Sequence, residues 1–391
     1  MDQIPCLDIL IYAHDGRGLG HASRSIAVGM AVRRLFPELK VLFVSGCRLS
    51  QELIGSAPLD WLKLPSYETK VEMGKSRGIA GRSLYTDTQL GRLRAEELRH
   101  LTKLYRPRLV LVDHTPQGKH KELVPALSAN DSRDTIWVLG VRGVVGEVPQ
   151  TRSELAATLF AQHYHSMLWY GDSTVLGPSH RRLLQQRFAT DPVECGYVLR
   201  LAELAFWHNP LPVPATSPAG TIAIPWLGEE SLRFLACLAE ALQKIPVSFG
   251  CWYLFIDTGA EPETQRAIGA LFREVENCRI EPPGGNYVPT LLHSKTAVVY
   301  GGYNSIMDIL HVRIPALIVY REMADEEQRI HLERIVGATG EQVAMISESR
   351  VSAGELEELL LNNLGSKKAP TYGIMTDGAS SAAKYLCRLL S

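Results

Sequence analysis

The chain has 391 residues, of which 46% are hydrophobic and 21% are charged, and its formal net charge is −1 at pH 7. This length exceeds what one hydrophobic core usually supports, so two domains are expected, and the composition excludes a largely disordered protein. Because basic and acidic residues are interspersed, the charge gives no basis for a nucleic-acid partner.

The cysteines and the N-terminal residues indicate the compartment. The seven cysteines form no C-x-x-C pair and follow no regular spacing, which is typical of reduced thiols in a cytoplasmic protein. The first residues do not show the pattern of a signal peptide, a basic segment followed by an apolar one. No stretch approaches the roughly 20 apolar residues that span a bilayer. We predict a cytoplasmic protein, for which peripheral contact with a membrane stays open.

The first half alternates short apolar runs with segments of helical period, as parallel sheets covered by helices do. Strands are predicted at 7–13, 41–45, 109–113, 136–141 and 167–170, with helices at 22–35 and 91–105. Residues 67–87 are polar and contain glycines, which predicts a mobile loop.

The second half repeats the alternation after a proline-rich passage at 209–218. Strands are predicted at 221–225, 252–256, 297–300 and 316–320. A helix is predicted at 229–244, with one side formed by Leu232, Leu235, Leu238 and Leu242. The predicted organisation is an α/β protein with two doubly wound domains: residues 1–200, a linker at 201–219, residues 220–375, and a C-terminal helix at 376–391 that packs on the first domain. Such sheets bind ligands at the carboxyl ends of their strands, so two facing domains would form a cleft.

A glycine-rich turn follows the first predicted strand. Gly16, Gly18 and Gly20 allow close approach of a ligand to backbone amides at a helix N-terminus, which suits an anion or a sugar. Because His21 or Ser23 occupies the third glycine position of G-x-G-x-x-G, a bound NAD is not favoured.

His21 and Asp113 are the candidate catalytic residues. His21 lies where strand gives way to helix, and a neutral imidazole there can take a proton from a hydroxyl or an amine. The alternative is a histidine that caps or packs against the turn. Asp113 closes another strand, where it can orient His21, act as the base itself or cap a loop. Arg142, which follows the strand at 136–141, and residues 67–87 are candidates for the acceptor pocket.

The most informative passage follows the predicted strand at 297–300. Gly301 and Gly302 end that strand, and Asn304 or Ser305 can cap the next helix, whose amides would bind a diphosphate. Asp308 lies one turn further along, where its carboxylate can accept both hydroxyls of a ribose. One turn and helix therefore offer sites to a diphosphate and a ribose.

The strand at 316–320 leads to a loop with further polar groups. Asp325, Glu327 and Gln328 are groups that read sugar hydroxyls, and Arg321 can neutralise phosphate charge. The alternative is an ordinary strand-to-helix turn followed by a solvated acidic run. The combination of these residues at these spacings favours a nucleotide-sugar site.

These motifs resemble those of a known family. The segment from Gly301 through Asp308 and Pro315 to Gln328 is similar to the donor-binding signature of predicted bacterial glycosyltransferases related to MurG, the peptidoglycan N-acetylglucosaminyltransferase. The turn from Gly16 to Arg24 resembles the acceptor-side loop of the same group. The resemblance implies the GT-B fold, in which two facing Rossmann-like domains enclose a cleft. It also implies that Asp308 binds the ribose, Gln328 the donor sugar, and that His21, with Gly18 and Gly20, lies on the acceptor side.

The resemblance implies an inverting glycosyltransferase that moves a hexose or N-acetylhexosamine from a nucleotide-diphosphate sugar, a UDP-sugar, to a small-molecule or lipid-linked acceptor. No Asp-x-Asp motif and no ligand-spaced His/Cys cluster occurs, so neither a metal nor another cofactor is expected. Pro225 and Trp226 stand where relatives carry a glycine-rich turn, so part of the diphosphate contact of those relatives is not carried over. His331 stands where MurG has asparagine, so the sugar is not assigned. The alternatives are a nucleotide-sugar 2-epimerase on the same fold and a non-catalytic GT-B partner subunit.

Overall fold

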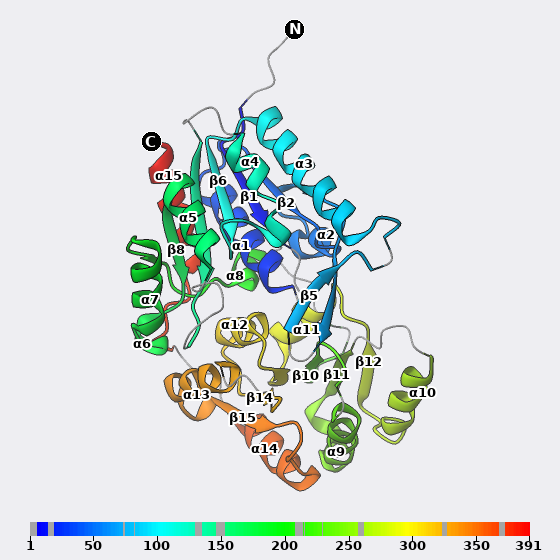
Figure 1. The fold of residues 1–391 in the computed structure, drawn as a ribbon. Helices are drawn as coiled ribbons and strands as arrows, with labels where there is room; N and C mark the ends of the chain where they lie inside the picture. The colour runs from blue at the N-terminus through cyan, green and yellow to red at the C-terminus, as the bar shows by residue number, and fades with distance from the viewer. Residues whose placement is uncertain are drawn as a thin grey trace. The chain divides into compact units, whose positions relative to one another are not determined.

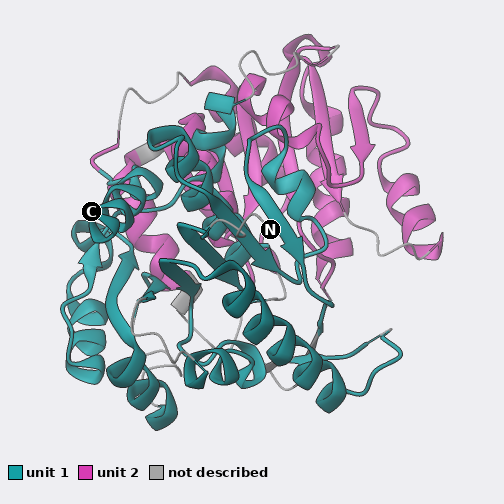
Figure 2. Ribbon diagram, turned by 90° about the horizontal axis from the view of Figure 1, so that it is seen from above, with its two compact units in different colours: residues 1–208, 374–391 teal, residues 209–373 magenta. Residues whose placement is uncertain are grey.

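The computed structural model describes residues 6–14, 19–72, 75–81, 83–129, 135–145, 153–207, 214, 216–228, 230–256, 262–322, 327–366 and 372–391. The chain forms two compact units, one of residues 1–208 with 374–391 and one of residues 209–373 (Figure 2). The predicted linker at 201–219 differs from the structure at both ends, since a helix runs to Trp207 and a strand begins at Pro218.

The first unit contains a seven-stranded sheet in the order β3-β2-β1-β6-β7-β8-β9 (Figure 1). Its strands are β1 (Ile9–Ala13), β2 (Val41–Ser45), β3 (Asp60–Lys63), β6 (Leu109–Asp113), β7 (Ile136–Arg142), β8 (Tyr164–Tyr170) and β9 (Val193–Glu194). Its helices are α1 (Gly20–Leu35), α2 (Ser50–Ile54), α3 (Asp87–Tyr105), α4 (Val124–Ser128), α5 (Glu154–His163), α6 (Ser173–Leu176), α7 (Ser179–Phe188), α8 (Arg200–Trp207) and α15 (Gly378–Leu390), with a 3₁₀ turn at Lys119–Lys121.

All pairings in this sheet are parallel, and every residue of β1, β2 and β6 is buried. Strands covered on both faces need continuous apolar runs rather than alternation, which is the pattern that the sequence shows here. Ile9 pairs with Val41 of β2 and with Leu109 of β6, so β1 lies at the centre of the three strands.

The predicted loop at 67–87 is wrong over much of its length. Residues Glu68–Glu72 and Lys75–Ile79 form an antiparallel hairpin, β4 and β5. Its base is anchored by an apolar cluster of Tyr67, Ala80 and Leu90, and the Arg94 guanidinium stacks over the Tyr67 ring at 4.6 Å. The prediction failed because it was based on the polar composition of the segment, which does not reveal these few buried contacts.

The first unit is completed by the end of the chain. Helix α15 packs against α1 and buries Ala379, Ala382, Ala383 and Leu386. The Arg34 side chain of α1 donates to the Ser380 hydroxyl at 2.8 Å and forms a bidentate pair with Glu203 of α8. The predicted C-terminal helix at 376–391 therefore corresponds to α15, which belongs to the first unit.

The second unit contains a six-stranded parallel sheet in the order β12-β11-β10-β13-β14-β15. Its strands are β10 (Pro218–Ile224), β11 (Cys251–Ile256), β12 (Cys278–Glu281), β13 (Thr296–Tyr300), β14 (Ala316–Tyr320) and β15 (Val343–Ser347). Its helices are α9 (Ser231–Lys244), α10 (Pro262–Leu271), α11 (Tyr287–His293), α12 (Tyr303–Val312), α13 (Glu327–Thr339) and α14 (Ala353–Gly365), with 3₁₀ turns at Val247–Phe249 and Gly340–Gln342.

The buried face of α9 differs from the prediction at one position. Phe234, Leu235, Leu238 and Leu242 are buried, but Leu232 is 45% exposed. The helix begins at Ser231, so Leu232 lies in its first turn, and Phe234 takes the inward position there.

Each sheet reverses its strand order at one point. In the first unit β1 lies between β2 and β6, and in the second β10 lies between β11 and β13. Crossovers leave a doubly wound sheet in opposite directions at such a point, which opens a ligand crevice at the carboxyl ends of the two strands. Within the part of the chain that the structure describes, no helix is long and apolar enough to cross a membrane.

Candidate functional site

The first site is built at the reversal point of the first sheet, on the ends of β1 and β6 and the start of α1. Asp113 is the last residue of β6, and its side chain is 2% exposed. Its Oδ2 lies 2.5 Å from Nδ1 of His21, and its Oδ1 accepts from Nε of Arg24 at 3.1 Å and from Nη2 at 2.6 Å. His21 and Arg24 are one turn apart on α1, so one helix turn presents both to the same carboxylate.

The contacts of Asp113 and Arg24 favour one tautomer of the imidazole. Arg24 is permanently charged and only 2% exposed, and it donates twice to Oδ1 of Asp113. Its Nη2 also lies 3.4 Å from Nδ1 of His21, but the 2.5 Å contact of Nδ1 with the carboxylate oxygen is much shorter. Because a carboxylate oxygen accepts, this contact places the proton of neutral His21 on Nδ1 and a lone pair on Nε2. The His21 side chain is 25% exposed, so the imidazole remains accessible. The predicted pair of His21 and Asp113 is thus brought together by the fold.

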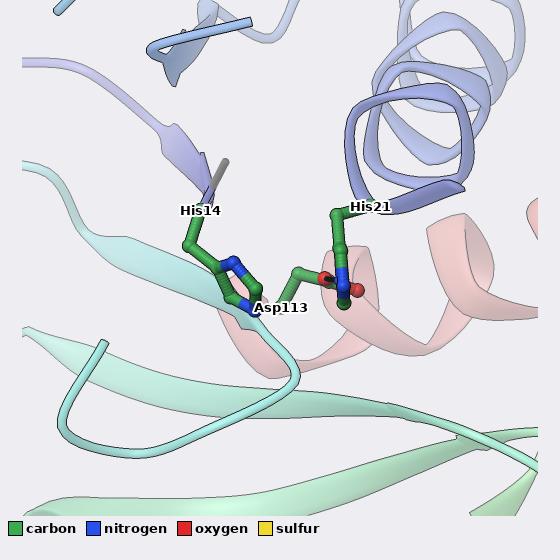
Figure 3. Close-up of side chains that lie close together, drawn as sticks. All are labelled: His14, His21 and Asp113. Carbon is green, nitrogen blue, oxygen red and sulfur yellow. Dashed lines mark hydrogen bonds and ion pairs between the residues drawn. The ribbon is translucent and has the colours of Figure 1, made fainter. Parts of the chain in front are cut away.

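Two further histidines surround His21. The ring of His14, which follows β1, lies 4.0 Å from the His21 ring between centroids, and the ring of His114, which follows Asp113, lies 4.9 Å from it. Figure 3 shows His14 and His21 directed toward the Asp113 carboxylate from two different elements. His114 has a φ of 81°, an unusual backbone conformation for a residue with a side chain, and such strain concentrates at functional sites.

Burial and neighbouring charged groups lower the pKa of two of these imidazoles, those of His21 and His114. Burial, followed by the charges of Arg24, Arg142 and Lys119, holds the pKa of His21 well below its usual value. Burial, followed by the neighbouring His21 and His14, likewise holds the pKa of His114 well below its usual value. Neutral imidazoles can accept a proton or bind a metal.

A buried network supports the end of β1 beneath this site. Arg94 of α3 forms a bidentate pair with Glu122, at 2.5 Å and 2.9 Å, and both side chains are 0% exposed. Tyr12 of β1 donates its hydroxyl to the same carboxylate, and Arg94 also donates to the Pro65 carbonyl at 2.5 Å. These bonds join β1, α3 and the segment after β6, so the backbone that carries His14 is held from two sides.

Of the predicted acceptor residues, the structure describes Arg142 and Gly20 but not Gly18. Arg142 is the last residue of β7, the strand next to β6, and its charge acts on His21. Gly20 is the first residue of α1, and a Cβ at this position would meet no atom within 4 Å. Gly18 lies outside the described residues. Arg142 and His21 thus lie at the same edge of the sheet, and the space beside the Gly20 Cα is not filled by protein atoms.

The second site lies at the reversal point of the second sheet. Gly301 and Gly302 follow β13, and Gly302 is the N-cap of α12, which contains Asn304 and Ser305 in its first turn. Gly302 is exposed, and a Cβ there would meet no atom within 4 Å. The positive end of a ten-residue helix thus points to open space, as an anion site requires.

Asp308 lies on α12, where it is 8% exposed. The Tyr287 hydroxyl of α11 donates to its Oδ2 at 3.2 Å, and the Tyr287 ring meets Phe255 of β11 edge to face. Tyr287 therefore orients the carboxylate that is predicted to bind the ribose.

Arg321 is held by the protein itself. Its guanidinium forms a bidentate pair with Glu348, at 2.7 Å and 3.1 Å, donates to the Trp226 carbonyl and lies 3.5 Å from the centroid of the Trp226 ring. Glu348 also accepts from Tyr300 and Ser231. Arg321 thus joins the ends of β13, β14 and β15, and direct contact with a phosphate stays a prediction.

The structure describes the residues predicted to contact the donor sugar only in part. Asp325 lies outside the described residues. Glu327 and Gln328 begin α13, but their side chains are not among those described. Their contacts with a sugar stay predictions.

Arg24, Tyr287 and Glu348 were not identified as site residues from the sequence. Arg24 carried a usable signal, because it lies three residues after His21, at the start of the predicted helix at 22–35. Glu348 and Tyr287 carried none, since β15 and α11 were not among the predicted elements.

The fold is the GT-B fold, as the comparison with solved structures shows. MurG of Acinetobacter baumannii matches over 97% of this chain and 95% of its own, with a TM-score of 0.50 and 13% identity. UDP-GlcNAc 2-epimerase of Methanocaldococcus jannaschii covers 98% of this chain and 99% of its own, with a TM-score of 0.63 and 9% identity. The Neisseria meningitidis UDP-GlcNAc 2-epimerase, solved with UDP-GlcNAc bound, has a TM-score of 0.58 and 12% identity over 98% of this chain and 99% of its own. The sequence matches no protein-family model and no curated protein.

Proposed function

We propose that the chain is a cytoplasmic inverting glycosyltransferase. The second unit binds a nucleotide-diphosphate sugar, a UDP-hexose or UDP-N-acetylhexosamine, and the first unit activates a hydroxyl or amine of a small-molecule or lipid acceptor. The observation that carries this proposal is the Arg24–Asp113–His21 arrangement at one reversal point, in which the buried Asp113 carboxylate contacts Nδ1 of the imidazole that we propose as the general base.

In the proposed reaction Nε2 of His21 takes the acceptor proton as the acceptor attacks the anomeric carbon. Asp113 stabilises the imidazolium that forms, because its carboxylate lies 2.5 Å from Nδ1. Arg24 acts as a positioning residue, since it holds the carboxylate in place through Oδ1. Arg142 contributes to the acceptor side.

The proposed donor site uses the turn at Gly301 and Gly302 and the first turn of α12. Amides at this helix end stabilise the charge of the leaving diphosphate without a metal ion. Asp308, oriented by Tyr287, accepts the ribose hydroxyls. Asp325, Glu327 and Gln328 are proposed to read the donor sugar.

Binding and turnover of single variants test the proposal. A panel of nucleotide diphosphates and nucleotide sugars should raise the thermal stability of the protein for one nucleotide class. His21→Ala should lower turnover by about 10²-fold or more while donor affinity stays within about twofold. Unchanged turnover in His21→Ala would exclude the base, and no stabilisation by any nucleotide would exclude the donor site.

A nucleotide-sugar 2-epimerase is the second candidate function, because the two epimerases have higher TM-scores than MurG. An epimerase needs no acceptor. Incubation with a nucleotide sugar alone, followed by chromatography of the sugar, distinguishes the two, since a new epimer without a second substrate would favour the epimerase. A non-catalytic partner subunit would bind the nucleotide and turn over neither.

A further inference from the structure

We propose that His14, His21 and Asp113 form a binding site for one divalent transition-metal ion of the Zn²⁺ type. Each residue offers one ligand atom, and these atoms lie within 4.8 Å of one another. The three side chains come from the end of β1, the start of α1 and the end of β6, and they converge as Figure 3 shows. Two imidazoles and one carboxylate are a donor set that holds zinc in enzymes with an open fourth position.

The distances are compatible with a bound ion after small side-chain movements. A tetrahedral ion with bonds of about 2.1 Å keeps its ligand atoms about 3.4 Å apart. The His21 and Asp113 atoms, now 2.5 Å apart, would separate by about 1 Å. His14 would approach by rotation of its side chain, because its ring already lies 4.0 Å from the His21 ring.

The carboxylate already has the support that a metal ligand requires. Arg24 donates to Oδ1 through two nitrogens, which leaves Oδ2 directed at the histidines. Ligating carboxylates are usually hydrogen-bonded in this way, and the outer partner fixes their orientation. Because the positive charge of Arg24 is matched by Asp113, the pair adds no net charge to the site.

The surroundings select the kind of metal. The charges of Arg24, Arg142 and Lys119 act on His21, and Nη2 of Arg24 lies 3.4 Å from its Nδ1, so a cation held by charge alone is disfavoured. Mg²⁺ and Ca²⁺ prefer oxygen ligands, whereas imidazole suits Zn²⁺, Co²⁺, Ni²⁺ and Cu²⁺. The site should therefore bind Zn²⁺ or Co²⁺ and reject Mg²⁺.

Occupation of this site would control the reaction, a consequence that rests on the proposed function. The ion binds the lone pair of Nδ1 in place of the proton between His21 and Asp113, and that proton moves through water to Nε2, because a neutral imidazole bound to a metal keeps its hydrogen on the other nitrogen. Nε2 then has no lone pair to take the acceptor proton, so Zn²⁺ should inhibit transfer although the reaction needs no metal.

Titration of the full-length protein with Co²⁺ and Zn²⁺ tests the site directly. Wild type should bind one Co²⁺ with visible bands of a tetrahedral site and without the near-ultraviolet band of thiolate ligands, which distinguishes it from the free cysteines. His14→Ala and Asp113→Asn should each weaken binding at least about 10-fold. His100→Ala, at an exposed position of α3, is the matched control and should bind as wild type. His14→Gln replaces His14→Ala if the latter does not fold.

The outcomes separate the site from the proposed function. Equal affinity of wild type, His14→Ala and Asp113→Asn would overturn the site, as would a thiolate spectrum or Mg²⁺ binding of equal strength. Specific Co²⁺ binding by a chain without transfer activity would keep the site and refute the transferase. Transfer that resists saturating Zn²⁺ would refute the inhibition alone.

Discussion

Asp113→Asn tests the geometry of the proposed base most directly. An amide has one accepting oxygen and one donating nitrogen, whereas the carboxylate accepts on both sides. Arg24 donates twice to Oδ1, so the amide oxygen should turn toward Arg24 and the NH₂ group toward Nδ1 of His21. His21 must then accept at Nδ1, which moves its proton to Nε2 and removes the lone pair that would take the acceptor proton.

The size of the effect follows from this change of tautomer. Loss of a general base costs about 10²- to 10⁴-fold in rate, which corresponds to about 2.7–5.5 kcal/mol in the activation free energy. Because the two residues act as one unit, the variant with both His21→Ala and Asp113→Asn should be little slower than His21→Ala alone.

The assay is single-turnover transfer with donor bound at saturation, together with calorimetric donor affinity for each variant. Donor affinity should be unchanged, because the donor site is proposed in the second unit, and this also shows that the variant is folded. An Asp113→Asn protein with turnover within threefold of wild type would refute the tautomer argument. The argument would also be refuted if the loss of turnover in the variant with both His21→Ala and Asp113→Asn equalled the product of the two single losses.

Three further predictions concern binding and stability. Asp308→Ala should weaken nucleotide diphosphate binding at least about 10-fold in calorimetry through the lost charged hydrogen bonds, and Tyr287→Phe should have a smaller effect. Glu122→Gln should lower the free energy of unfolding by about 3–5 kcal/mol in urea, because it leaves Arg94 buried without a charge partner; exposed Glu38→Gln should change it by less than about 0.5 kcal/mol. Burial alone would raise the pKa of Glu348, but hydrogen bonds from Arg321, Tyr300 and Ser231 hold that pKa below its usual value. The ionised Glu348 therefore contributes stability that is present above the unfolded pKa of about 4.3 and is lost as pH falls through the folded pKa. Glu348→Gln should reduce this acid dependence of the free energy of unfolding, measured in urea.

The central strands were predictable because a strand that is buried on both faces requires a continuous apolar run in the sequence. Residues 41–45, 109–113 and 316–320 coincide with β2, β6 and β14, each a short apolar run buried by helices on both faces. Edge strands were missed. Strands β3 and β12 contain exposed charged residues and have one neighbour each, so their sequences carry no such run.

The candidate site was predictable only where its residues lie close in sequence. The turn at Gly301 and the helix with Asp308 were found because one strand-helix unit carries both. His14 and His114 meet around His21 only because β1 and β6 are neighbours in the sheet, which no local spacing reveals. The same limit explains why the sequence did not indicate the proposed metal site.

Helix α15 has a consequence for how the protein is made. The first unit needs residues 374–391 to cover α1, yet the whole second unit lies between them and the rest of the first unit in the chain. Domains fold as they leave the ribosome, so residues 209–373 have all their strands while the earlier unit still lacks its last helix. The unit whose synthesis begins first is therefore completed last, and its α1 surface has no α15 against it until residues 374–391 have been made.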